Sequence, residues 1–307
     1  MTADPAVERV IGVDVVPPHG DLGEVSFIRA DIRNPVIAKV IAGEEVDTVV
    51  HISVEANPGK GGRAAMKEHN VIGTMQLLAA CQKAPRLERL VVRSSTDVYG
   101  SSSRDPAMFT EDLPARRTPR SGYARDMVEV EAYVRGFARR RPDVSVTMLR
   151  TAATLGPGSR SRLAEYFRLP VVPTVLGFDP RLQLLHETDL LEVLRHATVA
   201  GVHGTFNVAG SGVLMLSQAV RRLGRPTVAV PGFALGSAGA LGGFSGLAQL
   251  VEYLSFGRGV DTTRMREVLG FTTDYTTVEA FADFAASVPP GLLPTWPDLA
   301  SAGVGRG

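Results

Sequence analysis

Residues 87–100 read Leu-Glu-Arg-Leu-Val-Val-Arg-Ser-Ser-Thr-Asp-Val-Tyr-Gly and join an apolar run directly to a row of hydroxyl side chains. The run Leu87–Val92 is short and rich in β-branched residues, which is typical of a strand. Strands buried on both faces occur in parallel sheets, and ligands bind such sheets at the carboxyl ends of the strands. The stretch therefore predicts a parallel sheet with polar residues at its ligand-binding edge.

Segments on either side of this stretch continue an alternation of strands and helices. The remaining predicted strands are Val10–Asp14, Val25–Asp31, Val46–Ile52, Val144–Arg150, Leu184–His186 and Thr205–Val208. The predicted helices are Val36–Ala42, Met66–Ala84, Tyr123–Arg140 and a segment after Thr188 or Asp189. Such alternation predicts an α/β fold with a doubly wound parallel sheet covered by helices on both faces.

Composition and charge exclude several classes of function. The 307 residues are 44% apolar and 21% charged with a net charge of +1, so we expect a globular protein that does not bind nucleic acid. The single cysteine, Cys81, cannot form an internal disulfide, and no secretory leader follows Met1, so we expect a cytoplasmic location. We also expect no metal site.

The stretch Val228–Leu250 carries no charged residue and is long enough to span a bilayer. It also contains six glycines, and each glycine weakens a helix by about 1 kcal/mol relative to alanine. We therefore predict a mobile apolar flap or a surface that contacts a partner rather than a membrane span.

Several residues at predicted strand ends could bind a ligand. Asp14, Asp31, His51 and Ser94 are all in such positions. The Asp14 carboxylate could accept hydrogen bonds from both hydroxyls of an adenosine ribose, which would favour NAD over NADP because a 2′-phosphate would meet a like charge. Alternatively, Asp14 only begins the turn before Pro17.

Ser95 and Tyr123 could act as a pair on one substrate oxygen. A serine hydroxyl would hold the oxygen while the tyrosine phenol exchanges a proton with it. A phenol needs a nearby cation to act as a base at neutral pH, and the residue on the same helix face at i+4 is Met127. Asp126, at i+3, would oppose ionisation of the phenol. The alternative is that these hydroxyls only cap turns.

The order of these segments resembles the extended short-chain dehydrogenase/reductase family, in particular its NAD-dependent epimerase/dehydratase branch, from Val10 to about Phe284. The pieces that match are Val13-Asp14, Ala30-Asp31-Ile32, Asp47–Ile52, Asn70–Thr74, Ser94–Gly100, Tyr123, Leu185–Asp189, Gly204–Val208, Val260–Thr263 and Leu269–Phe271.

The resemblance implies a Rossmann-like fold and specific roles for site residues. It implies that Ser95 and Tyr123 are catalytic, that Asn70 shapes the site, and that NAD is bound with the help of the following residues: Asp14, Asp31, Ile32, His51 and Ser94. It further implies a small-molecule substrate and a possible homodimer.

The same resemblance implies a division into domains. A cofactor domain would comprise 1–150 with 183–212 returning to it. A substrate lobe would comprise 151–182 and 213–290, and 291–307 would form a disordered tail.

Three departures from the family pattern affect the expected function. The first is that the glycine-rich βα unit that would cradle the cofactor pyrophosphate is missing, so we expect weakened NAD binding, an absent central strand and loose packing of Val10–Ala30. The second is Met127 at the position of the catalytic lysine, which implies impaired turnover unless Arg116, Arg117 or Arg120 replaces that charge. The third is Leu182 where enzymes of nucleotide sugars commonly have arginine.

Two functions remain open on the sequence. One is an NAD-linked epimerase/dehydratase-like oxidoreductase that acts on a sugar nucleotide or on an apolar hydroxyl or keto substrate. The other is a non-catalytic binding or regulatory module that contacts a partner through its apolar stretch.

Overall fold

The computed structural model describes residues 1–2, 4–56, 61–113, 118–235 and 246–293. The chain forms two compact units. Unit 1 contains Met1–Ser94, Asp126–Leu149 and Glu192–Thr205, and unit 2 contains Ser95–Arg125, Arg150–Leu191 and the chain from Phe206 onward.

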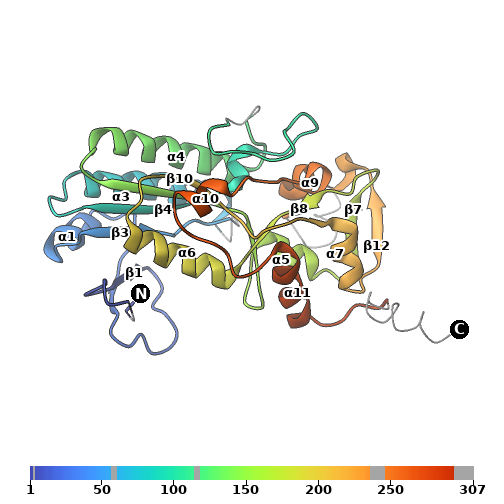
Figure 1. Cartoon of the computed structure of the whole chain (residues 1–307), viewed down its shortest axis with the longest axis horizontal. Helices are drawn as coiled ribbons and strands as arrows, with labels where there is room; N and C mark the ends of the chain where they lie inside the picture. The colour runs from blue at the N-terminus through green and yellow to red at the C-terminus, as the bar shows by residue number, and fades with distance from the viewer. Residues whose placement is uncertain (3, 57–60, 114–117, 236–245, 294–307) are drawn as a thin grey trace, which may run out of the picture. The chain divides into compact units, whose positions relative to one another are not determined.

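The largest sheet has four strands in the order β10-β5-β4-β3, which are Gly204–Val208, Ser145–Thr151, Arg89–Ser95 and Thr48–His51. Strands β3 and β4 are parallel, and His51 lies opposite Val92. The longer helices in this part of the sequence are α1 (Val36–Gly43), α3 (Gly73–Gln82), α4 (Gly122–Arg140) and α6 (Glu187–Ala200), as Figure 1 shows. The prediction of an α/β fold with parallel strands is confirmed.

Strands β1 (Ile11–Asp14) and β2 (Ser26–Arg29) form a separate parallel pair in unit 1. None of their eight residues is buried, whereas four of the seven residues of β4 are. Apolar burial is the main favourable term in folding, so this pair receives little stabilisation from side-chain packing.

The predicted helix Met66–Ala84 differs from the observed backbone. Helix α2 (Gly62–Lys67) passes through one wide π-helical turn (Glu68–Ile72) into α3. The apolar periodicity of the sequence did not indicate this turn, because one extra residue in a turn changes the pattern little. Such turns often occur at functional sites, and this one contains Asn70.

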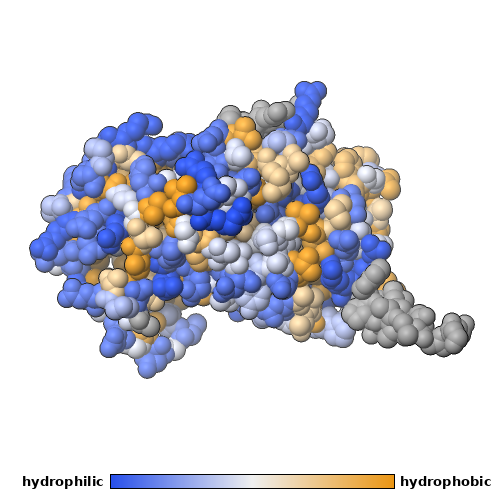
Figure 2. Space-filling model, viewed as in Figure 1, coloured by the Kyte–Doolittle hydropathy of each residue, from blue (hydrophilic) through white to orange (hydrophobic). Residues whose placement is uncertain are grey.

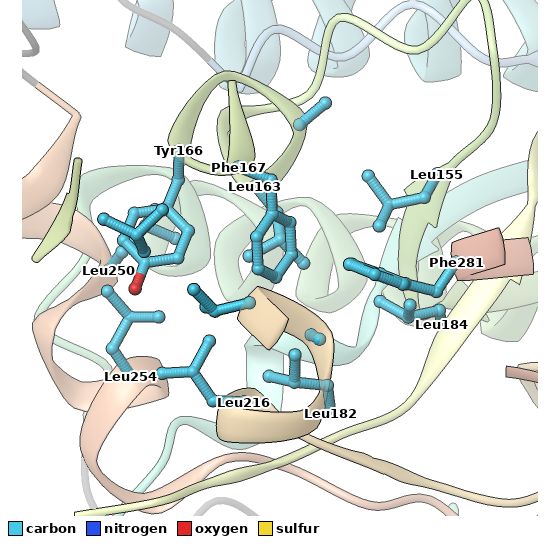
Figure 3. Packing of buried hydrophobic residues seen from close by; sticks show 14 of the residues in the cluster. Leu155, Leu163, Tyr166, Phe167, Leu182, Leu184, Leu216, Leu250, Leu254 and Phe281 are labelled. Atoms are coloured by element: carbon cyan, nitrogen blue, oxygen red, sulfur yellow. The ribbon is translucent and has the colours of Figure 1, made fainter. Parts of the chain in front are cut away.

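Unit 2 has its own hydrophobic core, shown in Figure 3. Phe167 of α5 (Arg162–Phe167) packs edge-on against Phe281 of α11 (Thr277–Ser287), with ring centroids 5.1 Å apart. Helices α7 (Leu216–Arg222) and α9 (Leu247–Phe256) add leucines to this core.

Short strand pairs complete the second unit. Parallel pairs join β6 (Ala153–Leu155) to β9 (Leu184–His186) and β12 (Thr227–Val230) to β7 (Val172–Val175). An antiparallel pair joins β11 (Leu214–Met215) to β8 (Arg181–Leu182), and α10 spans Thr263–Glu267.

The uncharged stretch Val228–Leu250 contributes both to the core and to the surface. Leu235, Leu247 and Leu250 are buried, whereas Val228 is 51% and Phe233 86% exposed. On the face in Figure 2, hydrophobic residues gather over β7, β12 and α9. Residues 236–245 of the predicted flap lie outside the described residues. Among the described residues, no helix is both long and apolar enough to cross a membrane.

Candidate active site

The two carboxylates predicted to bind adenosine follow neighbouring parallel strands. Asp14 ends β1, and its carbonyl oxygen accepts a hydrogen bond from the Ala30 nitrogen, one residue before Asp31. The Asp14 side chain is exposed and accepts a bond of 3.0 Å from the Val16 nitrogen through Oδ1. The turn interpretation of Asp14 therefore describes its local geometry, and its exposed carboxylate is also suited to accept hydroxyl donors.

Asp31 is already paired within its own loop. Arg33 donates to both carboxylate oxygens, with Nη2 2.6 Å from Oδ2, and these bonds hold the pKa of Asp31 down to about 2. Ile32, between them, packs against α3, since its Cγ2 methyl would lie 2.7 Å from a Cβ atom added to Gly73. Gly73 thus allows the loop after β2 to approach the helix.

His51, at the end of β3, is buried and bonded to α3. Its Nε2 lies 2.8 Å from Thr74 Oγ1, and the Thr74 hydroxyl donates to the Asn70 carbonyl oxygen at 2.6 Å. Because the threonine has only one hydroxyl proton to donate, His51 Nε2 must carry the proton in their shared bond. Burial lowers the pKa of His51 to about 4, so its ring is neutral at pH 7.

The Asn70 side chain is fully buried and connects a loop to α4. Its amide exchanges two hydrogen bonds with the Glu55 backbone and donates to Asp126 Oδ2 at 3.3 Å. Arg63 pairs with the same Asp126 carboxylate through Nη1 at 2.8 Å. The Asp126 charge, which the sequence suggested would oppose ionisation of Tyr123, is therefore compensated by Arg63.

The two serines at the end of β4 have different partners. Ser94 is buried and donates to Glu131 Oε1 of α4 at 2.7 Å. Ser95 caps the short 3-10 helix Thr96–Tyr99, since its Oγ accepts from the Asp97 nitrogen at 3.1 Å. Ser95 is thus a cap in this structure, and its hydroxyl proton is not used by that bond.

Tyr123, in the first turn of α4, lies beneath a guanidinium group. The Arg162 Cζ atom is 5.3 Å from the centroid of the tyrosine ring, and the two residues are only 7% and 6% exposed. Met127, one turn further along α4, is fully buried. The described guanidinium over this tyrosine ring therefore comes from α5, whereas the i+4 position carries no charge.

Arg162 belongs to a larger network of charges in unit 2. Its Nη2 atom is 3.7 Å from Asp97 Oδ2, while Arg258 Nη1 is 2.5 Å from Asp97 Oδ1. Gln249 of α9 accepts a further bond from Arg162. Two guanidinium groups thus share one carboxylate.

A cavity of about 380 Å³ lies in unit 2 near this network. Arg258 donates to the Gly100 carbonyl oxygen at 2.7 Å and to Ser101 Oγ at 3.1 Å, and both acceptors belong to residues that line the cavity. Six of its thirteen lining residues carry hydroxyl groups: Tyr99, Ser101, Ser102, Ser103, Thr118 and Ser255. The volume lies within the usual range for ligand pockets.

The structure joins some predicted site residues and leaves others apart. His51 and Asn70 are connected through Thr74. Ser95 accepts a hydrogen bond from the Asp97 backbone, and Arg162 connects the ring of Tyr123 to the Asp97 carboxylate. Arg120, one of the alternative cations, pairs instead with Glu252 and is largely exposed. Arg116 and Arg117 lie outside the described residues.

Sequence reasoning missed Arg162, Asp97 and Arg258. Arg162 follows Tyr123 by 39 positions and Arg258 follows Asp97 by 161, so no local spacing could pair them. Among the described residues, no cluster of His, Cys, Asp or Glu is arranged to hold a metal ion.

Comparison with known proteins identifies the family. The profile of the NAD dependent epimerase/dehydratase family matches residues 3–209. The chain belongs to this family. An uncharacterized protein of Mycobacterium tuberculosis is 50% identical to this chain over 293 residues. The match covers 92% of this chain and 78% of the mycobacterial protein.

Solved structures share the family fold. MoeE5, solved with UDP-glucose and NAD, superposes with a TM-score of 0.70 at 22% identity and covers 91% of this chain and 90% of its own. DesIV, a dTDP-glucose 4,6-dehydratase of Streptomyces venezuelae, gives a TM-score of 0.71 at 20% identity, with 93% and 89% covered.

Proposed function

We propose that this protein is an NAD-linked epimerase/dehydratase-type oxidoreductase that acts on a sugar nucleotide. The observation that carries the proposal is the network in unit 2, in which the hydroxyl-lined cavity is connected through Arg258, Asp97 and Arg162 to Tyr123. Family membership and the nucleotide-sugar ligands of similar solved structures support the same assignment.

Each residue has a defined chemical role in this proposal. NAD, when bound, would accept or return a hydride. The Tyr123 phenol would exchange a proton with the substrate oxygen, and the Ser95 hydroxyl would donate a hydrogen bond to the same oxygen. Asn70 would act as a positioning residue, because its buried amide fixes the loop at Glu55 to α4.

The described residues support binding of the adenosine end of the cofactor. Exposed Asp14 offers carboxylate oxygens to an adenosine ribose and would repel a 2′-phosphate, which supports NAD rather than NADP. Three further residues predicted to bind NAD contact helices that flank these strand ends. His51 and Ile32 contact α3, and Ser94 contacts α4. The weakened NAD affinity implied by the departures from the family pattern stays a prediction.

The cavity lining favours a hydroxylated substrate over an apolar one. Its serine and threonine hydroxyls, together with Asp105, Arg120 and Glu252, offer both donors and acceptors. Buried polar groups left without partners by an apolar ligand would cost binding free energy. Phe256, Pro119 and Val251 provide the apolar part of the lining that a sugar ring could contact.

Calorimetric titration tests the cofactor and the substrate class together. We expect NAD to bind more tightly than NADP, and UDP-glucose to bind in the presence of NAD where a hydroxysteroid does not. Asp14→Asn should narrow the difference between the two cofactors. Preferential binding of the hydroxysteroid would contradict the proposed substrate class.

A second candidate is a non-catalytic module that contacts a partner through its apolar stretch. It is favoured by the local role of Ser95 as a cap and by the buried Met127 in place of lysine. Retention of cellular function by Tyr123→Phe would support this candidate. Two further expectations remain predictions, namely the homodimer and the cytoplasmic location. The same holds for a cofactor domain of 1–150 with 183–212 and a substrate lobe of 151–182 and 213–290.

A further inference from the structure

We propose that Arg162 is the positioning residue that favours the deprotonated form of the Tyr123 phenol, in place of the absent i+4 lysine. This inference deepens the proposed function and rests on its assignment of Tyr123. The Arg162 guanidinium lies over the tyrosine ring at 5.3 Å, and Met127 cannot supply a charge.

Arg162 is held firmly in this position. It is the first residue of α5, and Ser161 caps that helix by accepting from the Ala164 nitrogen at 3.2 Å. Gln249 accepts a hydrogen bond from its guanidinium. The arginine is only 7% exposed, so its field at Tyr123 is screened less than that of a surface arginine.

The surrounding charges leave Arg162 with part of its charge uncompensated. Its carboxylate partner, Asp97, is 3.7 Å away and is bonded more closely to Arg258 at 2.5 Å. Near Tyr123 on α4 itself, Arg125 is exposed and Asp126 is paired with Arg63. On α5, Glu165 is exposed. The closely paired groups are thus balanced. Of the charges named here, the Arg162 guanidinium is the one that lies over the Tyr123 ring.

A titration of the phenol itself tests the inference without relying on turnover. The protein is labelled with ¹³Cζ-tyrosine, the Tyr123 resonance is assigned by its loss in Tyr123→Phe, and its midpoint is followed by NMR in the folded full chain. The Arg162 Cζ atom is 5.3 Å from the centre of the tyrosine ring, and a nearby opposite charge moves a pKa by roughly 1–3 pH units, so we expect the midpoint to rise in Arg162→Met.

Two further variants separate charge from packing. Arg162→Lys keeps the charge and should retain most of the lowered midpoint, and Arg160→Met removes an exposed neighbouring arginine and should leave the midpoint unchanged. Arg162→Gln, which keeps an amide donor for Gln249, replaces Arg162→Met if that variant fails to fold. Equal midpoints in the parent and the uncharged variant, or a lysine variant that behaves like the uncharged one, would overturn the inference.

Activity then distinguishes the two proposals. A shifted Tyr123 midpoint without NAD-linked turnover supports the role of Arg162 and counts against the proposed function. Turnover that depends on Tyr123 but an unshifted midpoint supports the function and overturns the role of Arg162.

Discussion

The arginine over the Tyr123 ring, Arg162, is far from Tyr123 in the sequence. This changes the expected effect of placing a lysine at the i+4 position. Met127 is fully buried, so a lysine there would place an ammonium group away from water. We expect Met127→Lys to lower the free energy of unfolding by about 2 kcal/mol or more, because a buried charge without a partner is costly.

Met127→Leu is the matched control and should cost less than about 1.5 kcal/mol, since it conserves volume and polarity. Urea denaturation measures both variants. A lysine variant as stable as the parent and more active would show that the ammonium finds a partner near Tyr123, and that the missing lysine does limit this chain.

His51 makes stability depend on pH in a defined range. Its pKa is about 4 in the folded protein against 6.5 as its ordinary value, so between these limits the unfolded chain binds the extra proton. Stability therefore falls as the pH is lowered from 6.5 to 4, by at most about 3 kcal/mol from this residue.

The difference in unfolding free energy between pH 7.5 and pH 4.5 should be smaller in His51→Gln than in the parent. Asp31 titrates near pH 2 and so contributes little within this range. An unchanged difference would show that His51 is not held neutral by its burial against Thr74.

For single residues, the sequence indicated which polar side chains lie at strand ends but not which side chains they contact. Asp14, His51 and Ser94 could be placed because a strand pattern ends at each of them. Arg162, Arg258 and the pair of Arg63 with Asp126 depend on contacts between segments that are distant in the sequence, and residue spacing carries no information on such contacts.

The junction of the π-helical turn and α3 depends on a glycine. A Cβ atom at Gly73 would lie 2.7 Å from the Ile32 Cγ2 methyl, whereas nothing lies within 4 Å of a Cβ at Gly43, the last residue of α1. We expect Gly73→Ala to destabilise the fold by about 1–3 kcal/mol through overpacking.

Gly43→Ala should be neutral or stabilising by up to about 1 kcal/mol, because alanine restricts the unfolded chain. Thermal unfolding of the two variants measures the contrast. Equal melting temperatures would mean that Ile32 moves aside freely and does not fix the loop after β2 to the helix.

Strands β1 and β2 should be the least protected strands of unit 1. Their residues are unburied and they pair only with each other among the described strands, whereas β4 is largely buried between neighbours. Native-state hydrogen exchange should show faster exchange for the amides of β1 and β2 than for those of β4. Equal protection would contradict the expectation of loose packing over Val10–Ala30.

The elements themselves were largely predictable. Strand β3, helix α4 and strand β10 occur within two residues of their expected limits, since a buried strand or an amphipathic helix has a clear local period. The π-helical turn at Asn70 and the two-residue strands β8 and β11 were not foreseen, because tertiary contacts and not local periods determine them.

In the molecule as a whole, a family fold is combined with an arginine, Arg162, over the ring of Tyr123. The family, the fold and the cavity in unit 2 agree with the proposed oxidoreductase of sugar nucleotides. The charge network from Arg258 through Asp97 and Arg162 to Tyr123 is the part of unit 2 on which the proposed activity depends.

The most direct test is the initial rate of NAD-linked conversion of UDP-glucose by the parent chain, Tyr123→Phe and Tyr133→Phe. General acid–base groups contribute about 10²–10⁴-fold to rate, so we expect Tyr123→Phe to lose at least about 100-fold. Tyr133, on the same helix and 40% exposed, should tolerate the same change without loss. Equal turnover by the parent and Tyr123→Phe would contradict the account.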